Sequence, residues 1–489
     1  SLSLSLSLSL SLSFSLPPAR RCPLSFVSFL SFPFFLYIFK LERMAATGGR
    51  LLGLVFAVQA LQWFSPSEAY FTPFVLARFA CLRGSTGHLE AHIYAWDVLL
   101  QAATALALAG VFAAGGFRWA WAVAVACSVA AVGLTRFGLT CGALLASQAA
   151  WAAGFAALFV VPAGLFVVLP PAQLQRAASV NSCAMLVASL TSSLIGYFID
   201  RGGGGRAAMT RTFDVTLASH SLALLVLGAG LAAGWVPPVV AGTLRRLLDV
   251  ARGPALRPPR LWLWLALHAV MRGVHTHVLT LWTPLAYTTV PAAQTQYNGL
   301  VAFAAYALAA VVVMLPVRFP WLHARAPLVL VGAYATCSIA LALVADASTL
   351  AQLGTALPVY HAAAELLLAV AAAHIARSLG TPRSDPLFGL QLVVIMLVRY
   401  SLGLLVQAAI ELAVYPSWGV YRNPTHMSLP TQFGVLAAIL AVMVPVALAA
   451  AVYLLQHEAT KEDGESRGDG GEAGAAAGGE NAPLLSTNN

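Results

Sequence analysis

The chain has 489 residues, of which 60% are hydrophobic and only 9% are charged. Soluble domains carry roughly 25% charged residues, so a soluble fold is excluded because it could not bury this much apolar surface. The net charge of +9 comes from scattered arginines rather than from a basic patch, which argues against nucleic acid as a partner. The composition indicates one multi-pass domain whose surroundings are the lipid bilayer.

Residues 1–43 form a low-complexity leader that we expect to lie outside the fold. The leader opens with a Ser-Leu repeat, and an apolar stretch follows two arginines, as a signal peptide or an extra span would also show. Met44 begins a more ordinary sequence. We therefore expect the leader to be dispensable for folding.

Apolar runs of about the length that crosses a bilayer recur twelve times after the leader. Six lie in residues 44–243 and six in residues 261–455. The break at 244–260 is rich in arginine and proline, so we interpret it as a cytoplasmic central loop. The sequence thus predicts an all-α membrane protein with twelve transmembrane helices in two pseudo-symmetric six-helix bundles, the layout of the major facilitator fold. The expected spans are 51–77, 93–114, 119–135, 140–169, 177–199, 215–238, 261–289, 299–316, 326–345, 352–379, 387–414 and 431–455.

The last segment, residues 456–489, is polar and rich in Gly, Ala and Glu. Such a composition cannot bury enough apolar surface to order itself, so we predict a disordered cytoplasmic tail. Glu480, Leu484 and Leu485 stand there in the order Glu-x-x-x-Leu-Leu, which is similar to an acidic dileucine sorting signal. We expect the protein in the plasma membrane or in an endosomal or vacuolar membrane.

The cysteines and the short motifs give no support for an enzyme. The six cysteines show no CxxC and no metal-ligand spacing, so we interpret them as small core residues. No phosphate-binding glycine loop, His-Glu-x-x-His sequence or nucleophile elbow occurs. We therefore expect neither a metal nor another cofactor, and a multi-pass membrane enzyme or a non-transporting receptor is only a distant alternative. The cysteines are Cys22, Cys81, Cys127, Cys141, Cys183 and Cys337.

Glu68 is an ionisable side chain inside the first predicted span, where a charge is costly and is turned toward a cavity or a partner. It stands between Pro66 and Pro73, which loosen the helix and free backbone carbonyl groups. A carboxylate here suits a cation, a proton or a donor group of a solute. The alternative is a structural ion pair with an arginine elsewhere in the bundle.

The seventh predicted span carries a cationic stripe. His268, Arg272 and His275 follow one another at i, i+4 and i+7, which places them on one helical face. Such a face suits an anion in a water-filled cavity. The alternative is a gate in which these side chains pair with Glu68 or Asp97 of the other bundle.

The eleventh predicted span contains Arg399 near its centre, too deep to reach either membrane surface. It needs a partner or a ligand, and Glu365 in the preceding span is the candidate internal partner. His361 lies one helical turn from Glu365 and would share that site. Several aromatic residues would either stack on a flat heterocycle or anchor the helices at the interface. They are Trp63, Tyr70, Trp96, Trp262 and Trp282.

Four stretches of the chain, in the same order and spacing over about residues 50–455, resemble the solute-carrier family of reduced folate carriers and thiamine transporters. They are Pro66-Ser67-Glu68-Ala69-Tyr70-Phe71-Thr72-Pro73, Pro171-Ala172-Gln173-Leu174-Gln175-Arg176 with Thr191-Ser192-Ser193, Tyr297-Asn298-Gly299 and Leu387-Phe388-Gly389. The resemblance implies a major facilitator fold and the transport of a water-soluble vitamin.

The resemblance also implies roles for single positions. Glu68 falls on the first-helix glutamate of the family, and Asn298 on an asparagine that lies in the binding cavity of thiamine transporters. Arg399 falls where folate carriers have lysine and thiamine carriers have glutamine, while His361 falls on an arginine of the tenth helix. Leu158 departs from the pattern, because the family has a charged residue at that position of the fourth helix.

Our preferred interpretation of the sequence is a carrier of folate-like organic anions that works by alternating access. An anion that enters against a negative-inside potential needs about 2.3 kcal/mol per charge per 100 mV, so a coupled proton or an exchanged anion is expected as well. The near alternative is a thiamine or phosphorylated-thiamine transporter. In the preferred interpretation the anionic groups bind Arg399, His361, His268, Arg272 and His275, Asn298 bonds the heterocycle, and Glu68 binds a ring nitrogen or couples protons.

Overall fold

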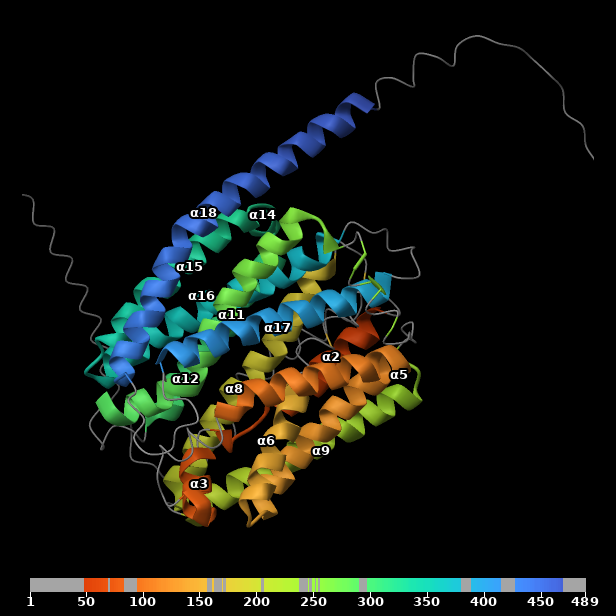
Figure 1. Cartoon of the computed structure of the whole chain (residues 1–489). Helices are drawn as coiled ribbons and strands as arrows, with labels where there is room; N and C mark the ends of the chain where they lie inside the picture. The colour runs from red at the N-terminus through yellow and green to blue at the C-terminus, as the bar shows by residue number, and fades with distance from the viewer. Residues whose placement is uncertain are drawn as a thin grey trace, which may run out of the picture. The chain divides into compact units, whose positions relative to one another are not determined.

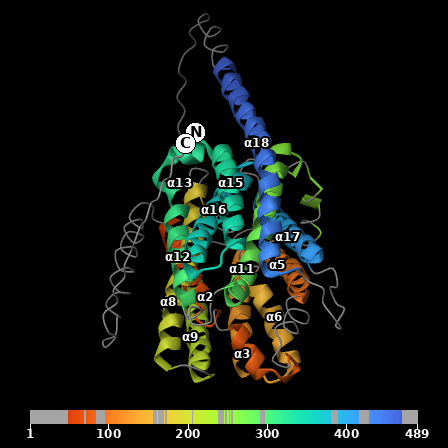
Figure 2. The same cartoon turned by 90° about the vertical axis from the view of Figure 1, so that its left-hand side faces the viewer.

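The computed structural model describes residues 48–68, 71–82, 95–155, 161, 169, 173–203, 206–236, 245, 249–250, 252–253, 256–289, 297–379, 388–414 and 427–468. These residues are almost entirely helical, and no strand occurs among them. Figures 1 and 2 show long helices that pack side by side. The elements are α2 (Gly48–Trp63), α3 (Phe71–Arg78), η3 (Ala80–Leu82), α5 (Ala95–Phe137), α6 (Cys141–Phe155), α8 (Leu174–Gly203), α9 (Arg206–Ala232), α11 (Pro259–Thr289), α12 (Asn298–Val313), α13 (Leu315–Arg318), α14 (Pro320–Ala324), α15 (Ala326–Ala345), α16 (Leu350–Arg377), α17 (Phe388–Val414) and α18 (Leu429–Gly468).

The helices follow the predicted spans in chain order. Helices α2 and α3 share the first span, α5 holds both the second and the third, and each later span contains one of the long helices. Eight helices in the described part of the chain are long and apolar enough to cross a membrane. The prediction of an all-α, multi-pass membrane protein is confirmed.

Two glycines shape the ends of helical segments. Gly116 has a φ of 75° inside α5, a left-handed conformation that separates the second predicted span from the third. Gly234, with a φ of 68°, ends α9 in a Schellman motif, in which Trp235 N–H donates to the Gly230 carbonyl oxygen at 3.0 Å. Only a residue without Cβ adopts these angles at no steric cost.

The first predicted span is broken between α2 and α3, after residue 63. The break contains Pro66, which has no N–H to continue the helix. Its backbone is fixed from α9 instead, because Ser67 N–H donates to Thr216 Oγ1 at 3.2 Å and the Thr216 hydroxyl lies 3.0 Å from Ser67 Oγ. Glu68 follows directly, so α9 determines where this carboxylate stands.

Two cysteines correct the prediction that all six are core residues. Cys81, in η3, and Cys141, at the start of α6, form a disulfide with their Cα atoms 6.3 Å apart. Beside it, Arg78 Nε donates to the Gly138 carbonyl oxygen at 2.9 Å. The two cysteines lie 60 residues apart in separate helical elements, and no local spacing motif indicates such a pair. Cys127, Cys183 and Cys337 are free.

Helix α18 ends at Gly468, later than the tail boundary predicted at residue 456. The segment that continues the helix contains Glu458, Glu462 and Glu465, and glutamate is a strong helix former although it is polar. Residues 469–489, with the sorting pattern of Glu480, Leu484 and Leu485, lie outside the described residues, as does the leader 1–43.

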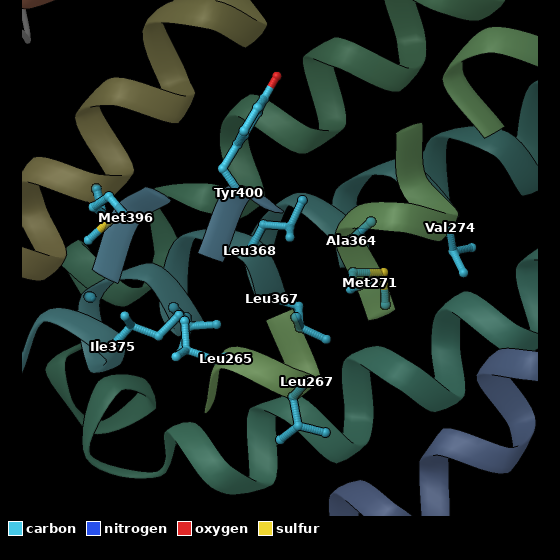
Figure 3. Close-up of a cluster of buried hydrophobic side chains, with 14 of the residues drawn as sticks. Leu265, Leu267, Met271, Val274, Ala364, Leu367, Leu368, Ile375, Met396 and Tyr400 are labelled. Atoms are coloured by element: carbon cyan, nitrogen blue, oxygen red, sulfur yellow. The ribbon is translucent and has the colours of Figure 1, made fainter. Parts of the chain in front are cut away.

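A buried apolar cluster joins α11, α16 and α17. Figure 3 shows Leu265, Met271, Leu367 and Met396 among its members. Helix α16 also packs against α8, and α5 packs against α17, so the helices of residues 44–243 contact those of residues 261–455. The charged side chains described next stand on this rigid support.

Candidate functional site

A cavity of about 280 Å³ is lined by helices from residues 44–243 and by helices from residues 261–455. Its wall is mixed, with aromatic rings, hydroxyl groups and a few charged side chains. Ligand sites are typically apolar pockets with a small number of polar groups that fix orientation. The lining residues include Trp63, Glu68, Trp151, Phe155, Ser189, Ser192, Ser193, Arg272, Trp282, Tyr306, His361 and Glu365.

Glu68 is placed in this cavity by the break between α2 and α3. Its N–H donates to the Ser65 carbonyl oxygen at 3.0 Å, and its side chain is exposed to the cavity. Neither ion pair formed among the described residues includes Glu68. The carboxylate therefore faces whatever enters the cavity.

The three residues of the predicted cationic stripe on α11 have different surroundings. Arg272 lines the cavity, and its guanidinium carbon lies 5.4 Å from the ring centroid of Phe155, across the interface between the bundles. His268 and His275 are buried and are not among the residues that line the cavity. The structure thus brings one of the three to the cavity surface.

His275 forms an ion pair with Glu365 of α16, with 3.1 Å between Nε2 and Oε1. The side chain of His275 is fully buried, whereas that of Glu365 is 12% exposed and reaches the cavity. The partner of His275 therefore lies in its own bundle, not in the other bundle as in the gate alternative. The side chain of Asp97, the other proposed partner, lies outside the described residues.

His361 completes this group one turn before Glu365 on α16. Its ring centroid lies 4.9 Å from that of His275 and 4.9 Å from that of Tyr306. The side chains that act electrostatically on Glu365 are His275, His361 and Arg272. The predicted pairing of Glu365 with Arg399 is replaced by the pairing with His275.

Arg399 is only 7% exposed and is not among the lining residues of the cavity. It lies within electrostatic range of Arg272 and His268. Asn298 opens α12 and is also outside the lining, with both side-chain amide atoms buried. Leu158 lies outside the described residues.

Part of the aromatic wall of the cavity was not predicted from the sequence. Trp63, which it named, packs on Phe155 with ring centroids 5.3 Å apart, and Trp151 and Tyr306 extend this wall. Ser192 and Ser193 belong to one of the four motif stretches and contribute hydroxyl groups. These serines can be recognised in the sequence because they form a serine-rich face within an apolar predicted span. Of the other named aromatics, Trp282 lines the cavity, Trp262 is 44% exposed and lies outside the lining, and Tyr70 and the side chain of Trp96 are outside the described residues.

No protein-family model matches the sequence, and no curated protein sequence matches it either. Solved structures do match the fold. The human organic anion transporter MFSD10 (TETRAN) has a TM-score of 0.57 at 15% identity over 82% of this chain and 100% of its own. The proton:xylose symporter XylE, bound to 6-bromo-6-deoxy-D-glucose, has a TM-score of 0.59 at 13% identity over 84% of this chain and 95% of its own.

A POT family transporter in complex with a thioalcohol-conjugated peptide gives a TM-score of 0.58 at 9% identity over 84% of this chain and 96% of its own. All three proteins are transporters, and XylE is described as a member of the major facilitator superfamily. Identities this low compare the fold alone. With its order of long apolar helices, this multi-pass membrane protein has the fold of the major facilitator superfamily.

Proposed function

We propose that this chain is a membrane transporter that moves a small water-soluble solute by alternating access. The observation that carries the proposal is the cavity between the two bundles, which is lined from both and presents Glu68, Arg272 and Glu365. Charged side chains at this depth are costly and mark solute or ion pathways. A cavity lined by both bundles opens to alternate sides when the bundles rock against each other.

The preferred solute is a folate-like organic anion with a flat heterocycle. Arg272 offers a planar guanidinium for a carboxylate, and Arg399 behind it adds positive potential. The Trp63 and Phe155 rings offer a stacking surface. Glu68 would accept hydrogen bonds from the ring nitrogens of the heterocycle. Entry of such an anion requires a coupled proton or an exchanged anion.

The second candidate is thiamine or phosphorylated thiamine. Two carboxylates, Glu68 and Glu365, reach the cavity against the single guanidinium of Arg272. Glu365 is compensated by His275, but Glu68 is open to a cationic ring. The fold does not choose between the candidates, because one fold serves many substrates.

Uptake by the purified protein in lipid vesicles tests both candidates. Radiolabelled folate and thiamine are offered separately, and Glu68→Gln and Arg272→Gln are measured beside the wild type. A folate carrier loses folate uptake in Arg272→Gln, whereas a thiamine carrier loses thiamine uptake in Glu68→Gln. Absence of uptake of either compound in well-folded wild-type protein would refute both substrate proposals.

A further inference from the structure

The cluster of His275, His361 and Glu365 has the make-up of a metal site. One ligand atom from each side chain lies within 4.8 Å of the others. Two imidazoles and one carboxylate form the donor set that Zn²⁺ takes in sites with an open coordination position. The 3.1 Å between His275 Nε2 and Glu365 Oε1 is close to the separation of about 3.3 Å that two ligands have around a tetrahedral zinc ion.

Two ring nitrogen atoms of the cluster make no hydrogen bond to a described residue. His275 Nδ1 and His361 Nε2 are buried and have no hydrogen-bond partner among the described residues. A buried polar atom without a partner costs about 1–3 kcal/mol. A metal ion would engage the unused lone pair of His361, and would replace the proton shared between His275 and Glu365.

We propose that His275, His361 and Glu365 form a binding site for a divalent first-row metal ion of the Zn²⁺ class. His361 and Glu365 line the cavity, so the remaining coordination positions face it and the ion enters by that route. The ligands come from α11 and α16, which pack directly against each other. The site thus needs nothing from the other bundle, and the proposal does not depend on the identity of a transported solute.

Arg272 opposes the metal ion. It acts electrostatically on Glu365 from the same cavity wall, and its positive charge repels a cation. This repulsion distinguishes metal binding at the site from adventitious metal binding elsewhere on the protein. Removal of the Arg272 charge should tighten binding at these three ligands and leave metal elsewhere on the protein unaffected.

The test is a Co²⁺ titration of tag-free, full-length protein in detergent, followed by visible absorption. We expect one Co²⁺ per chain, displaced by Zn²⁺. His361→Gln should weaken binding at least tenfold, and Arg272→Gln should strengthen it. The matched control is His277→Gln, which removes a buried histidine of the same helix that faces Gln432 and should leave the affinity unchanged.

Pulsed electron paramagnetic resonance of the wild-type Cu²⁺ complex provides a measurement that needs no variant. Two coordinated imidazoles are expected from His275 and His361. The proposal is overturned if the wild type binds no Co²⁺, if fewer than two imidazoles coordinate Cu²⁺, or if His361→Gln and His277→Gln reduce Co²⁺ affinity equally.

Discussion

The helices of residues 44–243 and those of residues 261–455 contribute different charged groups to the cavity. The half of residues 44–243 supplies Glu68, aromatic rings and hydroxyl groups, and its buried contacts include neutral hydrogen bonds such as Gln62 to Ser128 at 2.8 Å. The half of residues 261–455 also supplies hydroxyl groups and aromatic rings, and it adds Arg272, Glu365 and the imidazole of His361. The two halves therefore differ mainly in the charge that they bring to the cavity.

The two halves thus differ in the electrostatic cost of rearranging the side chains that they bring to the cavity. Neutral hydroxyl and aromatic groups can be rearranged around a solute at little electrostatic cost, whereas a buried charge must keep its partners. The basic side chains that act on Glu365 lie on α11 and α16, which pack against each other. We expect substitutions in the second half to be severe and coupled, and those in the first half to be milder and separable.

The largest effect is expected from Glu365→Ala. The substitution removes the partner of the fully buried His275, and breaking a buried ion pair costs about 3–5 kcal/mol. The measurement is thermal unfolding in detergent, monitored by fluorescence. The double variant with His275→Gln and Glu365→Gln should recover most of the loss, since it leaves no unpaired charge. If the double variant is no more stable than the single one, the pair is not a coupled unit.

The second largest effect is expected from opening the disulfide in the half of residues 44–243. Cys141→Ser opens a link across 60 residues, and such links stabilise by about 2–4 kcal/mol. The expected result is a lower unfolding temperature with unchanged substrate affinity, because neither cysteine lines the cavity. Cys127→Ser is the control, since Cys127 is free. Equal losses in both variants would argue against a contribution from the disulfide.

The two arginines of the second half should differ in their effect on anion affinity. Arg272→Gln removes a charge-assisted hydrogen bond and should cost about 1.5–3 kcal/mol, measured as folate binding by calorimetry. Arg399→Gln should cost less than about 1 kcal/mol, because Arg399 acts from behind the lining. If Arg399→Gln instead costs more anion affinity than Arg272→Gln, Arg399 is the direct ligand, as its position in the sequence indicates. Arg272→Lys keeps the charge and controls for folding.

The smallest effect is expected from Gly403→Ala on α17. A Cβ atom at this position would lie 3.0 Å from Arg272 Cγ, so the arginine stem must shift. We expect a loss of anion affinity of about 1 kcal/mol, the lower end of the cost of overpacking. Gly332→Ala has no neighbour within 4 Å and should leave affinity unchanged. A matching loss in Gly332→Ala would assign the effect to helix stability instead.

Hydropathy predicted the helices well because each span must be apolar over a fixed length. It also separated the second span from the third, and in the structure the helical backbone of α5 is interrupted between them at Gly116. Hydropathy indicated a tail from residue 456, whereas α18 ends at Gly468, because polarity indicates departure from the membrane and not the end of a helix.

The site was only partly predictable. Residue type and depth singled out Glu68, Arg272 and His361, which do line the cavity. Depth along a helix says nothing of how the helix is rotated against its neighbours, so Arg399 was expected at the cavity and is buried behind it. His275 and Glu365 are 90 residues apart, and only the packing of α11 on α16 brings them together.

The disulfide between Cys81 and Cys141 also predicts the orientation of the chain in the membrane. Protein disulfides persist in oxidising surroundings such as the lumen of the secretory pathway or the cell exterior. Cys81 follows the first predicted span and Cys141 lies at the start of the fourth, so an odd number of predicted spans lies between each cysteine and the arginine-rich loop at 244–260. We therefore expect that loop to face the reducing cytosol. The disulfide predicts the same orientation as the distribution of arginines, from redox chemistry instead of charge.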